Sequence, residues 1–161
     1  MFTSRRRAPA LLALFSLCVA TGVSAQLKDD QYDRFYARYV GHYTVNLAKS
    51  RYIKREAPKE PPSHTYSAIV GKKGITYNNE VVHLLDGREY PLAVGQSGAT
   101  VARQVLDEFT VSNTIRRNGQ IASRNTLVLS PDGTFAVMTF IDLSERGEPS
   151  VSSIVYYDKT P

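Results

Sequence analysis

The chain is poor in cysteine and has no tryptophan: among its 161 residues the only cysteine is Cys18. Because Cys18 lies close to the N-terminus, residues 26–161 contain no thiol. Disulfide bonds, cysteine nucleophiles and cysteine metal ligands are therefore excluded from that part of the chain. A chain of this length fits one domain of ordinary size, and it buries roughly two-thirds of its surface without such cross-links.

Long hydrophobic runs are also missing. The apolar run at residues 10–20 (ALLALFSLCVA) is well short of the roughly 20 residues that a membrane-spanning helix needs. Three arginines at 5–7 precede it, and residues 23–25 (VSA) supply small side chains after it. This order predicts a secretory signal peptide at residues 1–25, cleaved before Gln26. We therefore expect an exported protein, periplasmic or extracellular, without a transmembrane anchor.

The excess of positive charge is small outside that N-terminal segment. The formal net charge is +5, and the arginines at 5–7 account for three of these charges, which leaves +2 for residues 26–161. Such a balance gives no basic face for nucleic acid, and we expect no nucleic-acid partner. The sequence also has no phosphate-binding glycine loop, dinucleotide motif or G-x-S-x-G element, so we expect no cofactor.

The three histidines give little support for a metal site or an enzyme. His42, His64 and His83 do not have metal-ligand spacing, and we expect no metal. His83 lies in an apolar run, which favours a buried core or rim position. We therefore expect a protein without catalytic activity; the alternative is an enzyme that uses His83 or His42 for proton transfer.

Residues 26–40 form the N-terminal segment, and within it residues 29–40 (DDQYDRFYARYV) have the periodicity of a helix. The aromatic side chains fall on one face, which predicts a packing surface. Gly41 is expected to end the helix. The aromatic face consists of Tyr32, Phe35, Tyr36 and Tyr39.

After Gly41 the apolar period changes to two. Short segments rich in Val, Ile, Thr and Tyr alternate with turn signals, which predicts antiparallel strands in a closed barrel or a sandwich. Residues 53–63 (IKREAPKEPPS) are proline-rich and charged, and we expect an exposed loop there. The predicted strands are 42–47, 64–70, 74–78, 80–85, 88–92, 99–106, 109–117, 120–129, 134–141 and 150–157.

Two readings exist for the hairpin at Asn118-Gly119. A two-residue turn would place Ile115 opposite Ala122 and mix the apolar and polar faces. A three-residue loop at 117–119 pairs Ile115 with Ile121 and keeps the faces separate. Because a slip of one residue moves every side chain to the other face, the hydrophobic pattern predicts the three-residue loop.

The same loop type at 131–133 pairs Asn125 with Thr139. Polar side chains then gather at mid-strand on the inner face, where each must bond to another side chain, to water or to a ligand. They form either a buried network with water or the polar floor of a ligand pocket. The predicted ligand-binding residues are Phe109, Val111, Asn113, Ser123, Asn125, Val137 and Thr139.

In this register Ala136, Met138 and Phe140 lie on the outward face of their strand. Because they are apolar, we expect them to be covered. The N-terminal helix is the simplest candidate. The alternative is a partner that docks through Met138 and Phe140, either a second subunit or an envelope protein.

Residues 41–50 (GHYTVNLAKS) resemble the first strand of small exported bacterial lipocalin-like, or calycin-type, domains. Those domains begin with Gly, any residue and Trp, followed by an Asn-x-x-Lys-Ser stretch. Residues 86–92 (DGREYPL), 129–135 (LSPDGTF) and 155–159 (VYYDK) resemble later parts of the same family. The resemblance implies an antiparallel up-and-down barrel over residues 41–161, with about eight to ten strands and one N-terminal helix.

The chain departs from this family at Tyr43, which stands where the family has Trp. The resemblance implies that this side chain closes the barrel floor against an arginine. Arg116, Arg117 and Arg124 are the candidates for that partner.

These patterns favour a non-catalytic protein that holds a small, partly apolar ligand inside the barrel. A barrel of about eight or more strands has room for one such ligand. The alternative is a structural or protein-interaction module of the cell envelope, with a filled barrel.

Overall fold

The computed structural model describes residues 29–68, 74–78, 81–92 and 98–160. The predicted signal peptide at 1–25 lies outside these residues, as do parts of the predicted strands 64–70 and 80–85. The elements are α1 (Asp29–Tyr39), β1 (Gly41–Val45), β2 (Arg51–Tyr52), β3 (Ser63–Ala68), β4 (Gly74–Tyr77), β5 (Val81–Leu84), β6 (Asp86–Pro91), β7 (Ala99–Val105), β8 (Thr110–Arg117), β9 (Gln120–Leu129), β10 (Phe135–Leu143) and β11 (Pro149–Thr160).

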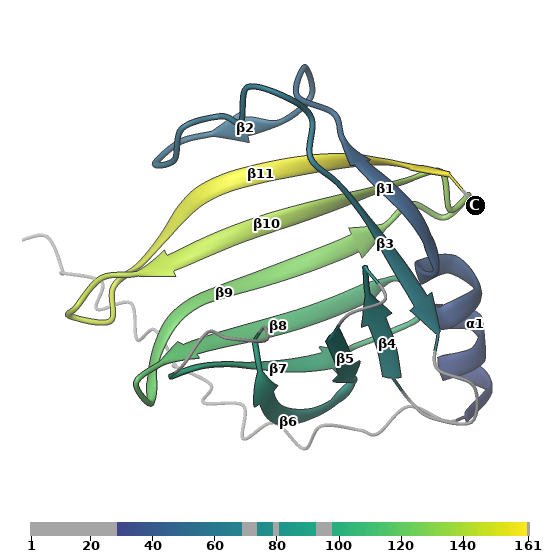
Figure 1. Ribbon diagram of the computed structural model, residues 1–161, viewed down its shortest axis with the longest axis horizontal. Helices are drawn as coiled ribbons and strands as arrows, with labels where there is room; N and C mark the ends of the chain where they lie inside the picture. Colours follow the sequence, from purple (N-terminus) through teal and green to yellow (C-terminus); the bar gives the residue numbers. More distant parts are fainter. Residues whose placement is uncertain (1–28, 69–73, 79–80, 93–97, 161) are drawn as a thin grey trace, which may run out of the picture.

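The strands form a nearly closed antiparallel barrel, which confirms the predicted fold class (Figure 1). Each of the ten predicted strands has a counterpart, and the short strand β2, which was not predicted, pairs with β11. The other strands follow one another around the ring in chain order. The first and last of them join, because β1 pairs with β11. The ends of the sheet order are β5 and β6, and Leu85 between them is fully buried.

Helix α1 packs across one end of the barrel with its aromatic face inward, which confirms the predicted packing surface (Figure 1). Phe35 and Tyr39 are 0% and 1% exposed, and their ring centroids lie 4.9 Å apart. The Tyr39 ring also lies 4.7 Å from that of Tyr66 on β3. Aromatic rings at these separations contribute beyond the area they bury. The helix therefore closes one end of the barrel.

The junction between α1 and β1 depends on the last strand. The ammonium group of Lys159 donates to the main-chain carbonyl of Arg38, a favourable place for a cation because carbonyls at a helix C-terminus lack partners. Gly41 follows with φ of 149°, and a Cβ atom there would lie 2.8 Å from the carbonyl oxygen of Thr160. Only glycine fits at this position, where the start of β1 lies close to the backbone at the end of β11.

The hairpin between β8 and β9 differs from the predicted three-residue loop. Arg117 pairs with Gln120, so the turn contains only Asn118 and Gly119. Their φ angles are 51° and 80°. Positive φ at both central residues defines the type I′ turn that matches the twist of a hairpin. The predicted loop at 117–119 is therefore wrong.

A β-bulge restores the alternation that the two-residue turn would otherwise disturb. Ile115 pairs with Ser123, and Ala122 is the extra residue on β9. Because a bulge adds one residue to one strand, it returns the odd-numbered side chains of both strands to the interior. The predicted inner face of β8, and that of β9 from Ser123 onward, are thus correct, but Ile115 pairs with Ser123 and not with Ile121, and Asn113 pairs with Asn125.

The hairpin between β9 and β10 is one residue longer than predicted. The main-chain N–H of Ser130 donates to the carbonyl of Phe135 at 3.0 Å, and these two residues close the loop. The longer loop shifts β10 by one position, so Asn125 pairs with Phe140 and not with Thr139.

This shift exchanges the two faces of β10. Ala136 and Met138 are 0% and 7% exposed, and both face the interior together with Phe140. Val137 and Thr139 lie on the opposite face. The predicted outward apolar face is therefore wrong, and so is the predicted partner surface through Met138 and Phe140. Helix α1 covers the barrel end and not that face.

The register of β10 can be tested with a pair of neighbouring variants. Ala136→Asp places a carboxylate in the core, and we expect it to lower the free energy of unfolding by roughly 3 kcal/mol or more. Val137→Asp lies on the other face, and we expect a loss of about 1 kcal/mol or less. Urea denaturation measures both. The reverse order would support the register predicted from the sequence.

Candidate functional site

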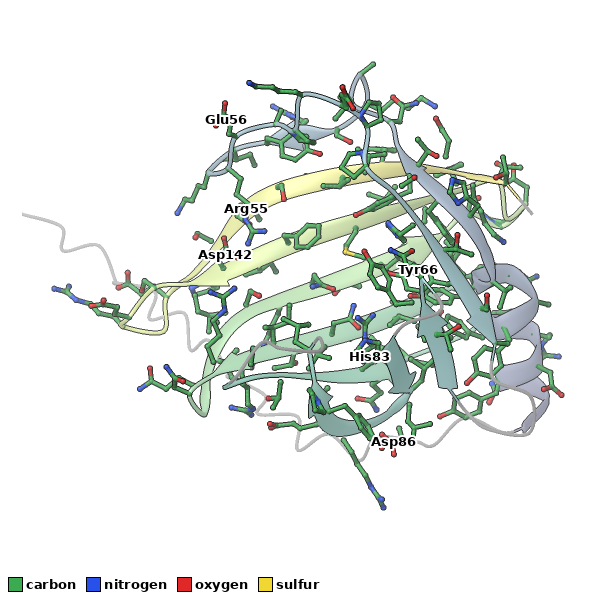
Figure 2. All side chains as sticks on the ribbon, in the orientation of Figure 1. Arg55, Glu56, Tyr66, His83, Asp86 and Asp142 are labelled. Carbon is green, nitrogen blue, oxygen red and sulfur yellow. The ribbon has the colours of Figure 1, made fainter. Side chains whose placement is uncertain are left out.

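The barrel contains a cavity of about 570 Å³ that opens to solvent beside the segment between β2 and β3. This volume falls in the range of about 300–1,000 Å³ that is typical of small-molecule sites. Figure 2 shows Tyr66 and His83 inside the barrel. Most of the wall is aromatic or aliphatic, and its aromatic members are Tyr52, His64, Tyr66, Tyr77, His83, Phe140 and Tyr157.

The mouth of the cavity is bordered by the loop that was predicted to be exposed. The loop is exposed along nearly its whole length, which confirms that prediction, and four of its residues also line the cavity. The guanidinium of Arg55 donates to Asp142 on β10 at 2.6 Å (Figure 2). It also lies 5.5 Å from the centroid of the Phe140 ring. These contacts hold the loop beside the mouth, and its lining residues are Arg55, Glu56, Pro58 and Pro62.

A row of inward side chains crosses five neighbouring strands at one level of the cavity. Each member is the register partner of the next, and all of them line the cavity. Cross-strand partners have Cβ atoms about 4.5–5.5 Å apart, so the row is continuous. From β7 to β11 the row consists of Arg103, Asn113, Asn125, Phe140 and Ser153.

The two asparagines of the row bond to each other. The amide nitrogen of Asn113 donates to Oδ1 of Asn125 at 2.5 Å, and both side chains are buried. The Oδ1 atom of Asn113 has no hydrogen-bond partner among the described residues. A buried acceptor without a donor costs roughly 1–3 kcal/mol, so this oxygen favours a donor from water or a ligand.

Arg103 brings a positive charge into the barrel. It lies on β7 between Val101 and Val105, which are 1% and 3% exposed and face inward. Its Nε atom is buried without an acceptor, and no carboxylate of the described residues lies within ion-pair distance of the guanidinium. Arg103 was not among the residues predicted from the sequence. The available signal was an arginine at the inward position between two valines of a predicted strand.

His83 is 1% exposed and lines the cavity, which confirms its predicted core or rim position. Its Nδ1 atom has no hydrogen-bond partner among the described residues. Burial, and to a smaller extent the positive charge of Arg103, together lower the pKa of His83 to about 4. The imidazole is therefore neutral at pH 7.

His64 is surrounded by tyrosine rings. Its ring centroid lies 5.0 Å from that of Tyr66, 5.2 Å from that of Tyr157 and 5.4 Å from that of Tyr77. Burial is the main cause that lowers the pKa of His64 to about 4, and positive charge on His42 and Arg103 adds to it. The Nε2 atom of His64 has no hydrogen-bond partner among the described residues. His64 thus offers a neutral, unpaired ring nitrogen to the cavity.

The predicted ligand-binding residues separate into distinct groups. Asn113 and Asn125 line the cavity. Val111 and Ser123 are buried on inner faces but are not part of the cavity wall. Phe109 is half-buried at the end of the barrel that α1 closes, where its ring lies against the guanidinium of Arg38.

The remaining two predictions, Val137 and Thr139, are corrected by the register of β10. The inner positions that were predicted for Val137 and Thr139 are occupied by Met138 and Phe140, and both of these line the cavity.

Tyr43 is fully buried, but it does not pair with an arginine. Its hydroxyl donates to the main-chain carbonyl of Tyr39 at 2.6 Å, which ties β1 to the end of α1. Arg116 instead pairs with a carboxylate of β6, and Arg117 and Arg124 are exposed. The predicted arginine partner is therefore wrong, and the helix backbone takes its place.

Within residues 29–68, 74–78, 81–92 and 98–160, no three His, Cys, Asp or Glu side chains converge in a way that could hold a metal ion. The helix in this part of the chain is too short to cross a membrane. Comparisons with protein-family models, with curated proteins and with solved structures found no match to this chain.

Proposed function

We propose that this protein is an exported, non-catalytic binding protein that holds a small, partly apolar ligand in the barrel. The observation that carries the proposal is the cavity of about 570 Å³, which opens beside the loop after β2. Its aromatic and aliphatic wall suits an apolar ligand body, since such walls are typical of small-molecule sites. Export rests on the pattern of residues 1–25.

Polar atoms without partners support a ligand that is only partly apolar. Four such atoms belong to residues that line the cavity. A ligand with a polar end can satisfy them, whereas a purely apolar ligand would bury them at a cost of roughly 1–3 kcal/mol each. The atoms are Nε2 of His64, Nδ1 of His83, Nε of Arg103 and Oδ1 of Asn113.

The alternative of an interaction module has lost part of its support. It expects a filled barrel whose contact is the outward apolar surface at Met138 and Phe140, a sheet edge or the loop at 53–63, but Met138 and Phe140 line the cavity. The resemblance of residues 41–159 to lipocalin-like domains agrees with the binding proposal. It is an argument from similarity, since a fold alone does not fix a function.

The proposal is tested with N-phenyl-1-naphthylamine, a neutral dye whose fluorescence rises in apolar surroundings. We expect saturable binding to the wild-type protein. Ile115→Trp fills the cavity from β8, and we expect it to weaken binding by about tenfold or more. Val128→Trp is the matched control, because Val128 is 44% exposed on the outer face of β9.

A fluorescence titration of the three proteins decides the matter. The control is expected to bind the dye within about twofold of the wild-type affinity. The absence of saturable binding to the wild-type protein would contradict the proposal. Equal affinities of the Ile115 and Val128 variants would place any bound dye outside the cavity and would contradict it as well.

A further inference from the structure

The interior of the barrel carries one positive charge that none of the described residues neutralises. Arg103 lines the cavity, and no carboxylate of the described residues lies within ion-pair distance of it. Of the described residues that line the cavity, only Glu56 has a carboxylate, and it is exposed on the loop at the mouth. The second lining arginine, Arg55, already pairs with Asp142 at 2.6 Å. Among the described residues that line the cavity, Arg103 is thus the cation without a counterion.

An unpaired cation in a partly buried position is unfavourable unless something binds to it. The register partner of Arg103, Asn113, does not compensate the positive charge, because it is neutral and already donates to Asn125. His64 and His83 are also neutral at pH 7, since the pKa of each is lowered to about 4. The cavity wall formed by Arg103, Asn113, His64 and His83 therefore has a net charge of +1, and this charge lies on Arg103 of β7.

The geometry of a guanidinium selects among anions. Its planar N–H donors match the two oxygens of a carboxylate, which can accept two parallel hydrogen bonds. A carboxylate carries one negative charge and neutralises Arg103 completely. A phosphate monoester carries about two negative charges at pH 7 and would leave one of them unpaired in the cavity.

We propose that the ligand is a carboxylate with an aromatic or other apolar body, and that its carboxylate pairs with Arg103 inside the barrel. This inference rests on the proposed binding function. The apolar body then packs against the rings of Tyr66, Tyr157 and Phe140, which line the same cavity.

Such a role has a consequence for the protein without ligand. If Arg103 serves the ligand and not the fold, then removing its charge does not weaken the unliganded barrel, because an unpaired buried charge opposes folding. We expect Arg103→Met to melt at the wild-type temperature or above it. A merely structural arginine would give a lower melting temperature.

The ligand preference is measured by displacement of N-phenyl-1-naphthylamine with three naphthalene compounds of similar size. These are 2-naphthoate, its neutral analogue 2-naphthamide, and 2-naphthyl phosphate. We expect the wild-type protein to prefer 2-naphthoate over 2-naphthamide by roughly 10- to 100-fold, since hydrogen bonds to charged groups are the strong ones. The phosphate is expected to bind more weakly than the carboxylate.

Arg103→Met is expected to abolish the preference for 2-naphthoate while it leaves 2-naphthamide binding within about threefold. Arg103→Gln, which keeps a polar end, gives the same comparison without an apolar replacement. The matched control is Arg116→Met on the neighbouring strand, because Arg116 does not line the cavity and its Nε lies 2.7 Å from Glu89. The control is expected to keep the preference.

The failures of the two proposals can be told apart. Cavity-dependent dye binding without a preference for 2-naphthoate would overturn the carboxylate inference and leave the binding function intact. Equal losses of affinity for 2-naphthoate and for 2-naphthamide in the Arg103 variants would overturn the inference too. So would tighter binding of 2-naphthyl phosphate than of 2-naphthoate by the wild-type protein. Absence of saturable dye binding to the wild-type protein, or equal dye affinities of Ile115→Trp and Val128→Trp, would count against the binding function itself.

Discussion

The free energy of unfolding is expected to fall steeply as the pH decreases from about 6.5 to about 4, because two buried histidines must remain neutral in the fold. The pKa of His64 and that of His83 are each lowered to about 4, whereas an unfolded chain protonates histidine near pH 6.5. Between these values the unfolded state binds more protons, so stability decreases as protons are added. Above pH 6.5 both states are neutral and the effect is absent.

The expected size is about 1.4 kcal/mol for each pH unit and each histidine, or roughly 3 kcal/mol for each histidine over the whole interval. Urea denaturation at a series of pH values measures it. The comparison variant is His42→Gln: His42 is exposed, and because burial is the main cause of the lowered pKa of His64 and the charge of His42 a smaller one, we expect most of the pH dependence to remain. Replacing His64 and His83 together by glutamine should flatten the curve.

The slope against pH is the informative quantity, because glutamine in a tyrosine-lined pocket also changes stability at neutral pH. A double variant with the wild-type slope would show that other groups control the acid sensitivity. Carboxylates contribute below about pH 5, so the interval between pH 5 and 6.5 reports most directly on the histidines.

The second large effect is expected from Phe35→Ala, which should lower the free energy of unfolding by about 3–5 kcal/mol. Phe35 is 0% exposed, and its ring lies 4.9 Å from that of Tyr39 in the helix that closes the barrel end. Its removal leaves a gap between α1 and the strands, which costs the burial of the ring and adds the cost of a cavity. Urea denaturation at pH 7 measures the loss.

Asp33→Ala is the control for this variant, because Asp33 is exposed on the same helix. We expect it to change the free energy of unfolding by about 0.5 kcal/mol or less. A similarly small change for Phe35→Ala would mean that α1 does not pack against the barrel in solution.

Local periodicity was enough to predict every helix and strand of the described residues except β2. The aromatic spacing of Tyr32, Phe35 and Tyr39 marked a packing face of a helix, and these side chains are buried against the barrel. Alternation likewise predicted each of the ten strands that form the ring, since the period of a strand depends only on neighbouring residues. The dipeptide Arg51-Tyr52 of β2 is too short to show any period, so that strand was missed.

The sequence could not fix the register of β10, because both of its faces are apolar. Phe135 and Val137 alternate with Ala136 and Met138, so the hydrophobic pattern supports either face equally. The length of the preceding loop decides the matter, and it is set by the hydrogen bond between Ser130 and Phe135. At β8 and β9 the turn was also predicted wrongly, but the bulge at Ala122 preserved the faces.

The candidate site belongs to the tertiary structure. His64, His83 and Arg103 lie on β3, β5 and β7, and no sequence motif connects them. They share one cavity only because the strands close into a ring, which brings positions far apart in the chain to the same interior. The sequence by itself determined the helix, the strands and the inner faces of β8 and β9, since these follow from short-range patterns. Closure of the barrel decided which polar side chains face one another and left Arg103 without a counterion among the described residues.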